Sequence, residues 1–231
     1  MGFGLGIGIG WPNSTSGASF NPGISLAIAP NAVFKIPAGG NFTIEWFQRV
    51  DSNMNDYKNI FQLTFALYEQ ISAQVIPNLL YFFTGETLVA TSLEGLNENW
   101  ATVALIRDNG FSKIYINGEL KVNEYIGSPG ASVGSAINPL YIGSAGQYGL
   151  LKGKLSNFRW SSEALYSSNY TPSTTPLSVL PSTKLLLFQG NTLELQLTDN
   201  TFINKNIVNT AGVYNSDNPF IGFQGCTAFD L

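Results

Sequence analysis

The stretch WATVALIRDNGFSKIYINGELK, residues 100–121, decides the fold. Apolar residues alternate with other residues on both sides of Asp108-Asn109-Gly110, and a second Asn-Gly pair follows at 117–118. Asn-Gly supplies the positive φ angles of a tight hairpin turn, so between alternating apolar segments it is the strongest short-range hairpin signal. The stretch therefore predicts an antiparallel meander, and one face of that sheet must be covered.

Segments of the same kind recur along the rest of the chain. They are short and rich in β-branched and aromatic residues, and Gly, Pro, Asn or Ser separates them. Trp46 alternates with Phe42 and Ile44 on one face, which is typical of a core residue. We expect strands within 24–50 and at 60–68, 71–76, 79–84, 87–93, 140–143, 153–161 and 184–189, a long loop from Val122 to Ala136, and further strands and turns near the C-terminus.

Length and composition favour one large domain. A chain of 231 residues is within the usual range of a single β-sandwich. Residues 1–10 alternate glycine with Phe3, Leu5, Ile7 and Ile9, so we assign residues 1–17 to a glycine-rich arm and 18–231 to the sandwich. The arm is either floppy or an extended segment that packs on a neighbouring subunit, and its alternation favours packing.

The residues that are absent exclude much chemistry. Without histidine there is no Ser-His or Cys-His pair and no histidine metal ligand. The single cysteine, Cys226, allows no intramolecular disulfide. With 11 Lys+Arg, 15 Asp+Glu and a net charge of −4, the chain has no basic surface for nucleic acid, and no membrane-inserting segment is expected.

An ordered set of motifs resembles the concanavalin A-like lectin/glucanase superfamily, in particular its laminin G-like jelly-roll members. The meander is followed by LYIG at 140–143, GKLSNFRWS at 153–161 and ALYSSNYTP at 164–172, and the resemblance covers residues 18–190. The later SNYTP, TKLLLFQGN and NPF are similar to versions in virion structural proteins of tailed phages and of algal large DNA viruses.

The resemblance implies an all-β fold, a two-sheet antiparallel jelly-roll sandwich. Glucanase members carry two catalytic carboxylates on alternate residues of one strand. The nearest pairs here are Glu94 with Glu98, Glu119 with Glu124, and Glu194 with Asp199, and none has that arrangement. We therefore predict a protein that is not an enzyme.

Binding residues are expected in loops. Four rings in predicted turns or loops are candidate sugar-stacking positions: Tyr57, Phe111, Tyr125 and Tyr148. Tyr148 with Gln147, between Gly146 and Gly149, is the favoured one, because the glycines leave the ring little to pack against. For each ring the alternative is a lid that closes the sandwich edge.

Asp108 and Asn109 are candidate polar ligand contacts. The family often holds Ca²⁺, but Asp and Asn are also the preferred turn formers, so no metal site and no cofactor is assigned. Sequons at Asn13, Asn41 and Asn169 fit glycosylation in a secretory setting or chance.

Three classes of function remain. The first is a virion structural or surface protein that assembles with itself or with other virion proteins and contacts host glycans. The alternative is a stand-alone carbohydrate-binding module or lectin outside the cell, and a glycan-cleaving enzyme is disfavoured. The expected location is the virion, with the extracellular space as the alternative.

Overall fold

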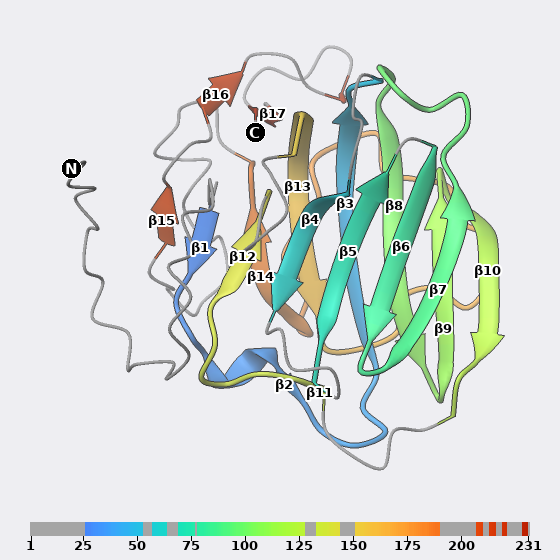
Figure 1. Ribbon diagram of the computed structural model, residues 1–231, viewed down its shortest axis with the longest axis vertical. Helices are drawn as coiled ribbons and strands as arrows, with labels where there is room; N and C mark the ends of the chain where they lie inside the picture. Colours follow the sequence, from blue (N-terminus) through green and yellow to red (C-terminus); the bar gives the residue numbers. More distant parts are fainter. Residues whose placement is uncertain are drawn as a thin grey trace, which may run out of the picture.

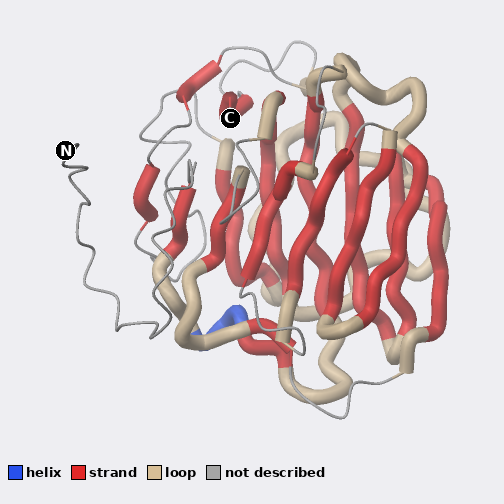
Figure 2. The backbone as a smooth tube through the Cα atoms, viewed as in Figure 1, coloured by secondary structure: helices blue, strands red, loops and turns tan. Residues whose placement is uncertain are grey.

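The computed structural model describes residues 26–52, 57–63, 69–76, 78–127, 133–143, 151–189, 207–209, 213–215, 219–220 and 228–230. Strands form nearly all of the regular structure, beside one short 3₁₀ turn at Ala32–Phe34 (Figure 2). The strands are β1 (Leu26–Ile28), β2 (Lys35–Ile36), β3 (Phe42–Val50), β4 (Lys58–Leu63), β5 (Ile71–Ile76), β6 (Leu79–Thr84), β7 (Thr87–Ser92), β8 (Ala101–Asp108), β9 (Phe111–Ile116), β10 (Glu119–Tyr125), β11 (Val133–Gly134), β12 (Leu140–Ile142), β13 (Gly153–Ser161), β14 (Thr183–Leu187), β15 (Ile207–Asn209), β16 (Val213–Asn215) and β17 (Ala228–Asp230).

Two antiparallel sheets lie face to face (Figure 1). The seven-stranded sheet has the order β15-β1-β12-β4-β5-β6-β7, and the eight-stranded sheet has the order β10-β9-β8-β3-β13-β17-β16, with β14 also paired to β13. The predicted all-β, two-sheet antiparallel sandwich is confirmed. Residues 1–17, the boundary of the proposed arm, and Cys226 lie outside the described residues.

The core forms where the inward-facing residues of both sheets meet. Trp46 on β3 is 1% exposed and packs against Phe61 and Phe158, with ring centroids 5.8 and 6.1 Å away. Phe42 packs against Phe82 of the opposite sheet in an edge-to-face pair at 6.3 Å. The prediction that Trp46 is a core residue is confirmed.

The two Asn-Gly turns have the predicted geometry. Asn109 and Gly110 adopt φ of 48° and 87°, and Asn117 and Gly118 adopt φ of 50° and 78°. Positive φ at both central residues defines the turn that matches the twist of paired strands. Strands β8, β9 and β10 follow as an antiparallel meander.

The predicted loop from Val122 to Ala136 is wrong in two places. Strand β10 continues to Tyr125 because the Asn117-Gly118 turn sets its register on β9, and a bulge between Leu120 and Val122 lets the pairing go on. The short strand β11 pairs with β2. The Gly- and Ser-rich composition of this segment does not indicate strands, because these strands form through pairing with β9 and β2.

The eight-stranded sheet is covered on both faces. Its outer face carries Ala104, Ile106 and Tyr115, which are fully buried. The covering element is the strap, residues 162–180, which lies between β13 and β14 without regular secondary structure. Its Tyr166 and Tyr170 pack on this face. Alternate residues of β8 point to opposite faces of the sheet, and apolar residues occupy both faces because the strap covers the outer one.

Candidate functional site

The outer face of the seven-stranded sheet combines aromatic and amide side chains. Residues paired directly across antiparallel strands lie on the same face, so the register defines two parallel rows. The first row is Asn59, Gln74, Tyr81 and Ala90, and the second is Tyr141, Gln62, Ser72, Phe83 and Leu88. Together with Tyr57, which precedes β4, these residues are called the aromatic–amide face.

Three aromatic rings that are exposed or half-buried lie close together on this face, from Tyr57 before β4 and from Tyr81 and Phe83 on β6. Tyr57 is 41% exposed, and its ring centroid lies 5.9 Å from that of Tyr81 at an interplanar angle of 43°. Phe83 follows two residues after Tyr81 on the same strand, and both rings are half-buried. Desolvation, and then the neighbouring Tyr57 hydroxyl, raise the pKa of Tyr81. Tyr81 therefore remains a neutral donor and acceptor at physiological pH.

The amide side chains on this face are more deeply buried than the rings, and two of them bond to each other. Gln62, Gln74 and Asn59 are at most 5% exposed, and Asn59 Nδ2 donates to Gln62 Oε1 at 2.9 Å. Ser72 is fully buried, and its Oγ accepts from Gln70 Nε2 at 2.6 Å. Burying amides on an outer sheet face costs desolvation, and the bond between Asn59 and Gln62 offsets part of that cost. The result is a buried polar floor beside a partly exposed aromatic platform.

Asp108 and Asn109 serve the β8–β9 turn. The Asp108 carboxylate accepts from Lys113 Nζ at 2.6 Å and from Asn109 Nδ2 at 2.9 Å, and the Asn109 backbone N–H donates to Asn41 Oδ1 at 2.8 Å. Both residues are therefore engaged within the turn, and the structure does not bring them together with Tyr57. Their ligand-binding role stays a prediction.

The other aromatic residues that the sequence suggests for sugar binding lie away from Tyr57 or outside the described residues. Tyr148 and Gln147 lie outside the described residues. Phe111 and Tyr125, which the sequence placed in turns, begin β9 and end β10, where they pair directly with ring centroids 5.1 Å apart. The turn assignment was wrong because an aromatic beside a Gly turn can equally be the first residue of a strand.

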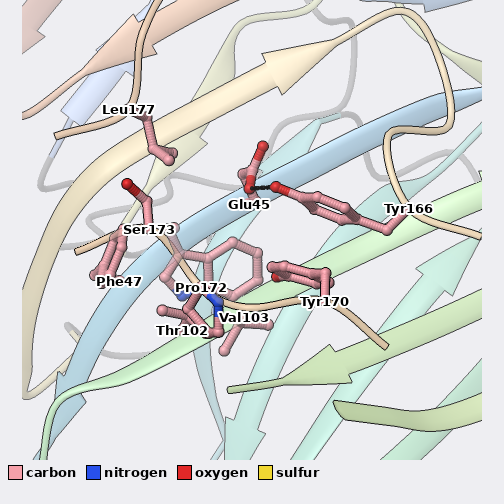
Figure 3. A pocket seen from close by; sticks show the side chains of 10 residues that line it. Glu45, Phe47, Thr102, Val103, Tyr166, Tyr170, Pro172, Ser173 and Leu177 are labelled. Atoms are coloured by element: carbon pink, nitrogen blue, oxygen red, sulfur yellow. Dashed lines mark hydrogen bonds between the residues drawn. The ribbon is translucent and has the colours of Figure 1, made fainter. Parts of the chain in front are cut away.

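A second polar cluster lies beneath the strap. Glu45 on β3 and Arg159 on β13 are opposite each other, with Arg159 Nη2 2.5 Å and Nε 2.8 Å from Glu45 Oε1. Tyr166 donates its hydroxyl to Glu45 Oε2 at 2.8 Å, and its ring stacks on that of Tyr170 at 3.6 Å (Figure 3). The adjoining cavity has a volume of about 10 Å³, about the space that one water needs.

This cluster was not predicted from the sequence. The available signal was a charged residue in the middle of each of two apolar strands, Glu45 in TIEWF and Arg159 in NFRWS. Buried charges are rare unless they are paired, so those two strands could have been predicted as neighbours. The pair holds the strap in place and leaves the carboxylate closed to a large substrate.

Four of the acidic residues considered for catalysis lie apart from this cluster, and the third pair, Glu194 with Asp199, lies outside the described residues. Glu94 and Glu98 occur in the turn after β7, and Glu119 and Glu124 occur on exposed β10. Within the described ranges, no group of three or more Asp, Glu or Cys side chains comes together as a metal site. In the same part of the chain, no helix has the length and apolarity to cross a membrane.

Comparisons with known proteins identify the class. The family model described as the concanavalin A-like lectin/glucanases superfamily matches residues 23–169, which is more than half of the chain. The chain belongs to this superfamily. No sequence in the collection of curated proteins matches it.

Solved structures share the fold at low sequence identity. A proposed carbohydrate-binding protein from Bacteroides ovatus is 19% identical, with a TM-score of 0.51 over 80% of this chain and 58% of that one. A heptameric SAP-like pentraxin from Limulus polyphemus is 16% identical, with a TM-score of 0.49 over 63% and 73%. Botulinum neurotoxin type C, described as entering cells through two ganglioside molecules, is 18% identical, with a TM-score of 0.44 over 56% and 34%. The match thus covers just over half of the solved Bacteroides chain and about a third of the solved toxin chain.

Proposed function

We propose that this chain is a non-enzymatic carbohydrate-binding domain whose ligand lies on the aromatic–amide face. The observation that carries the proposal is an aromatic platform, formed by the exposed Tyr57 and the half-buried Tyr81 and Phe83, beside the buried amides of Asn59 and Gln62, which bond to each other. Sugars present apolar C–H faces that stack on rings and hydroxyls that bond to amides and phenols.

The geometry favours recognition over cleavage. Glycoside hydrolysis needs two carboxyl groups that flank the scissile bond, and the residues of both rows on the aromatic–amide face are uncharged. The buried carboxylate of Glu45 is bound by Arg159 and Tyr166 beneath the strap, on the other sheet. The fold of the Bacteroides ovatus protein, itself proposed to bind carbohydrate, is consistent with such a role.

The test is a glycan array with the wild-type chain and three alanine variants. Tyr81→Ala, which removes the ring of the first row, should weaken binding to the best glycan about tenfold or more, since one lost stacking contact costs on the order of 1.4 kcal/mol. Tyr125→Ala tests another candidate ring, 67% exposed on the other sheet, and should leave binding unchanged if the aromatic–amide face is the site. Tyr148→Ala separates this face from the loop site that the sequence favours.

The outcomes are distinct. Loss in Tyr81→Ala alone supports the aromatic–amide face, and loss in Tyr148→Ala alone transfers the site to that loop. Silence of the wild-type chain across a broad array would contradict carbohydrate binding. Turnover of laminarin or agar would contradict the non-enzymatic assignment.

The setting is a narrower proposal: a glycan-contacting component of a virion surface. It is supported by the resemblance of the SNYTP, TKLLLFQGN and NPF motifs to virion proteins and by the glycine-rich arm at 1–17. It predicts assembly with itself or with other virion proteins. Light scattering on the full chain tests it, because a monomer at every concentration would favour the alternative of a solitary extracellular lectin.

A further inference from the structure

A groove opens where the two sheets end side by side. Strand β7 ends the seven-stranded sheet and β10 ends the eight-stranded sheet, and the two strands lie next to each other at one edge of the sandwich (Figure 1). The groove between them has a volume of about 300 Å³. It is lined by Thr91, Ser92 and Glu94 on one side and by Ile116, Glu119 and Lys121 on the other.

The β10 edge is protected against pairing with another strand. It carries Glu119, Lys121 and Glu124, its register is broken by a bulge, and the backbone N–H of Leu120 donates to Asn169 Oδ1 of the strap at 2.9 Å. Charges, bulges and covering segments are the features that keep natural edge strands from pairing.

Among the residues that the structure describes, the β7 edge has none of these features. Its sequence, TLVATS, contains no charge and no proline, and its register on β6 is unbroken from Thr87 to Ser92. In an antiparallel hairpin closed by two residues, the flanking pair, here Thr84 and Thr87, is hydrogen-bonded, and alternate residues then point their backbone groups outward. These are Leu88, Ala90 and Ser92, whose side chains are exposed. The strand is therefore a template for an added strand.

The residues that line the groove determine which side chains an added strand needs in order to bind there. An added strand directs every second side chain inward, toward an apolar floor of Leu96 and Ile116 and an acidic rim of Glu94 and Glu119. Lys121 Nζ lies 2.6 Å from the Glu119 carboxylate, and this exposed pair has no net charge. Glu94 adds a second carboxylate, so the rim as a whole carries a net negative charge. A long side chain with an apolar stem and a cationic end meets both requirements.

We propose that the β7 edge binds an extended peptide segment of another protein, adding it to the seven-stranded sheet as a strand with a Lys or Arg side chain in the groove. Backbone hydrogen bonds to Leu88 and Ala90 supply affinity, and the acidic rim selects the sequence. The peptide site uses the outward backbone groups of Leu88 and Ala90, at the β7 end of the two rows, whereas the proposed carbohydrate contacts are the side chains of Tyr57, Tyr81 and Phe83.

The test uses two short, end-capped peptides, one alternating Thr with Lys and one alternating Thr with Glu, with the full chain. We expect the Lys peptide to bind and to slow amide hydrogen exchange at Leu88 and Ala90, which only strand addition does. Binding should weaken about tenfold or more in Glu119→Lys, since a charged partner is worth roughly 1.5–3 kcal/mol. Glu86→Lys, in the turn at the other end of β7, is the matched control and should bind normally.

A backbone variant separates strand addition from simple charge attraction. Ala90→Pro removes an outward N–H and leaves the β6–β7 bonds, because proline is tolerated on edge strands where its nitrogen faces solvent. It should abolish binding, whereas Ala90→Ser should not, and thermal denaturation checks that both variants fold. Equal binding of the Glu peptide, binding without protection of β7 amides, or no binding of either peptide would overturn the proposal. Concentration-dependent protection of β7 without peptide would assign the edge to a second copy of the chain instead.

Discussion

Arg159 and Glu45 face each other across β13 and β3, and the guanidinium contacts the carboxylate through both Nε and Nη2 while each side chain is only 6% exposed. Arg159 Nη1 also donates to the Ser178 carbonyl, and Glu45 accepts from the Tyr166 hydroxyl. One buried ion pair therefore joins two strands of the sheet to both halves of the strap.

Breaking this pair on one side should be costly. Arg159→Met leaves the Glu45 carboxylate buried without its counter-charge, so we expect the free energy of unfolding to fall by about 3–5 kcal/mol. The double variant Glu45→Leu/Arg159→Met removes both charges and should recover most of that loss. Urea denaturation of both single variants and the double variant measures the coupling. A double variant that loses the sum of the single losses would show that the pair does not act as a unit.

Gly118 lets the strap approach the second turn of the meander. Its φ is 78°, and a Cβ there would lie 1.9 Å from the Tyr170 carbonyl oxygen, so Gly118→Ala must displace the strap. The matched control is Gly95→Ala, with the same φ and no atom within 4 Å of the added Cβ. We expect Gly95→Ala to cost about 1–2 kcal/mol from backbone strain alone, and Gly118→Ala clearly more. Equal losses in thermal denaturation would show that the strap contact is not stabilising.

Glu98 should contribute to stability above acidic pH. Hydrogen bonds from the Ser52 backbone N–H and then from its hydroxyl, at 2.8 and 3.0 Å, lower the pKa of Glu98 below the ordinary value of 4.5. A lowered folded-state pKa gives stability that is complete above the unfolded-state value and is lost as the pH falls through the folded-state value. Glu98→Gln keeps the acceptor without the charge, so its urea midpoint should fall less than that of the wild type between pH 6 and pH 3. Parallel curves would contradict this role.

The sequence predicts the elements whose pattern is local. The meander, its two Asn-Gly turns and the strands β5, β6 and β13 follow from alternation and turn chemistry, which act within a few residues. The end of β10 and strand β11 could not be predicted this way, because their pairing partners rather than their composition make them strands.

The candidate site was less predictable for a related reason. Tyr57 was identified as an exposed ring, but Tyr81, Phe83 and the amides were expected only as parts of strands. Their two rows form through register between β12, β4, β5 and β6, and register depends on turns and bulges such as the one between Asn59 and Phe61. A sequence shows which residues alternate, and the fold decides which of them become neighbours.

Tyr166 links the strap to stability at alkaline pH. Burial, followed by the negative charge of Glu45 and the hydrogen bond to it, raises the pKa of Tyr166 well above its ordinary value of 10. A raised folded-state pKa means that its stabilising effect is complete below the unfolded-state value and is lost as the pH rises toward the folded-state value. Tyr166→Phe should therefore lower the free energy of unfolding at pH 7 by about 1.5–3 kcal/mol, the worth of a hydrogen bond to a charged group. The variant should then lose less than the wild type between about pH 9 and pH 11. Tyr125→Phe is the control and should change neither quantity, since Tyr125 is 67% exposed. Urea denaturation across this pH range measures both, and an alkaline loss of equal size in wild type and Tyr166→Phe would assign it to other groups.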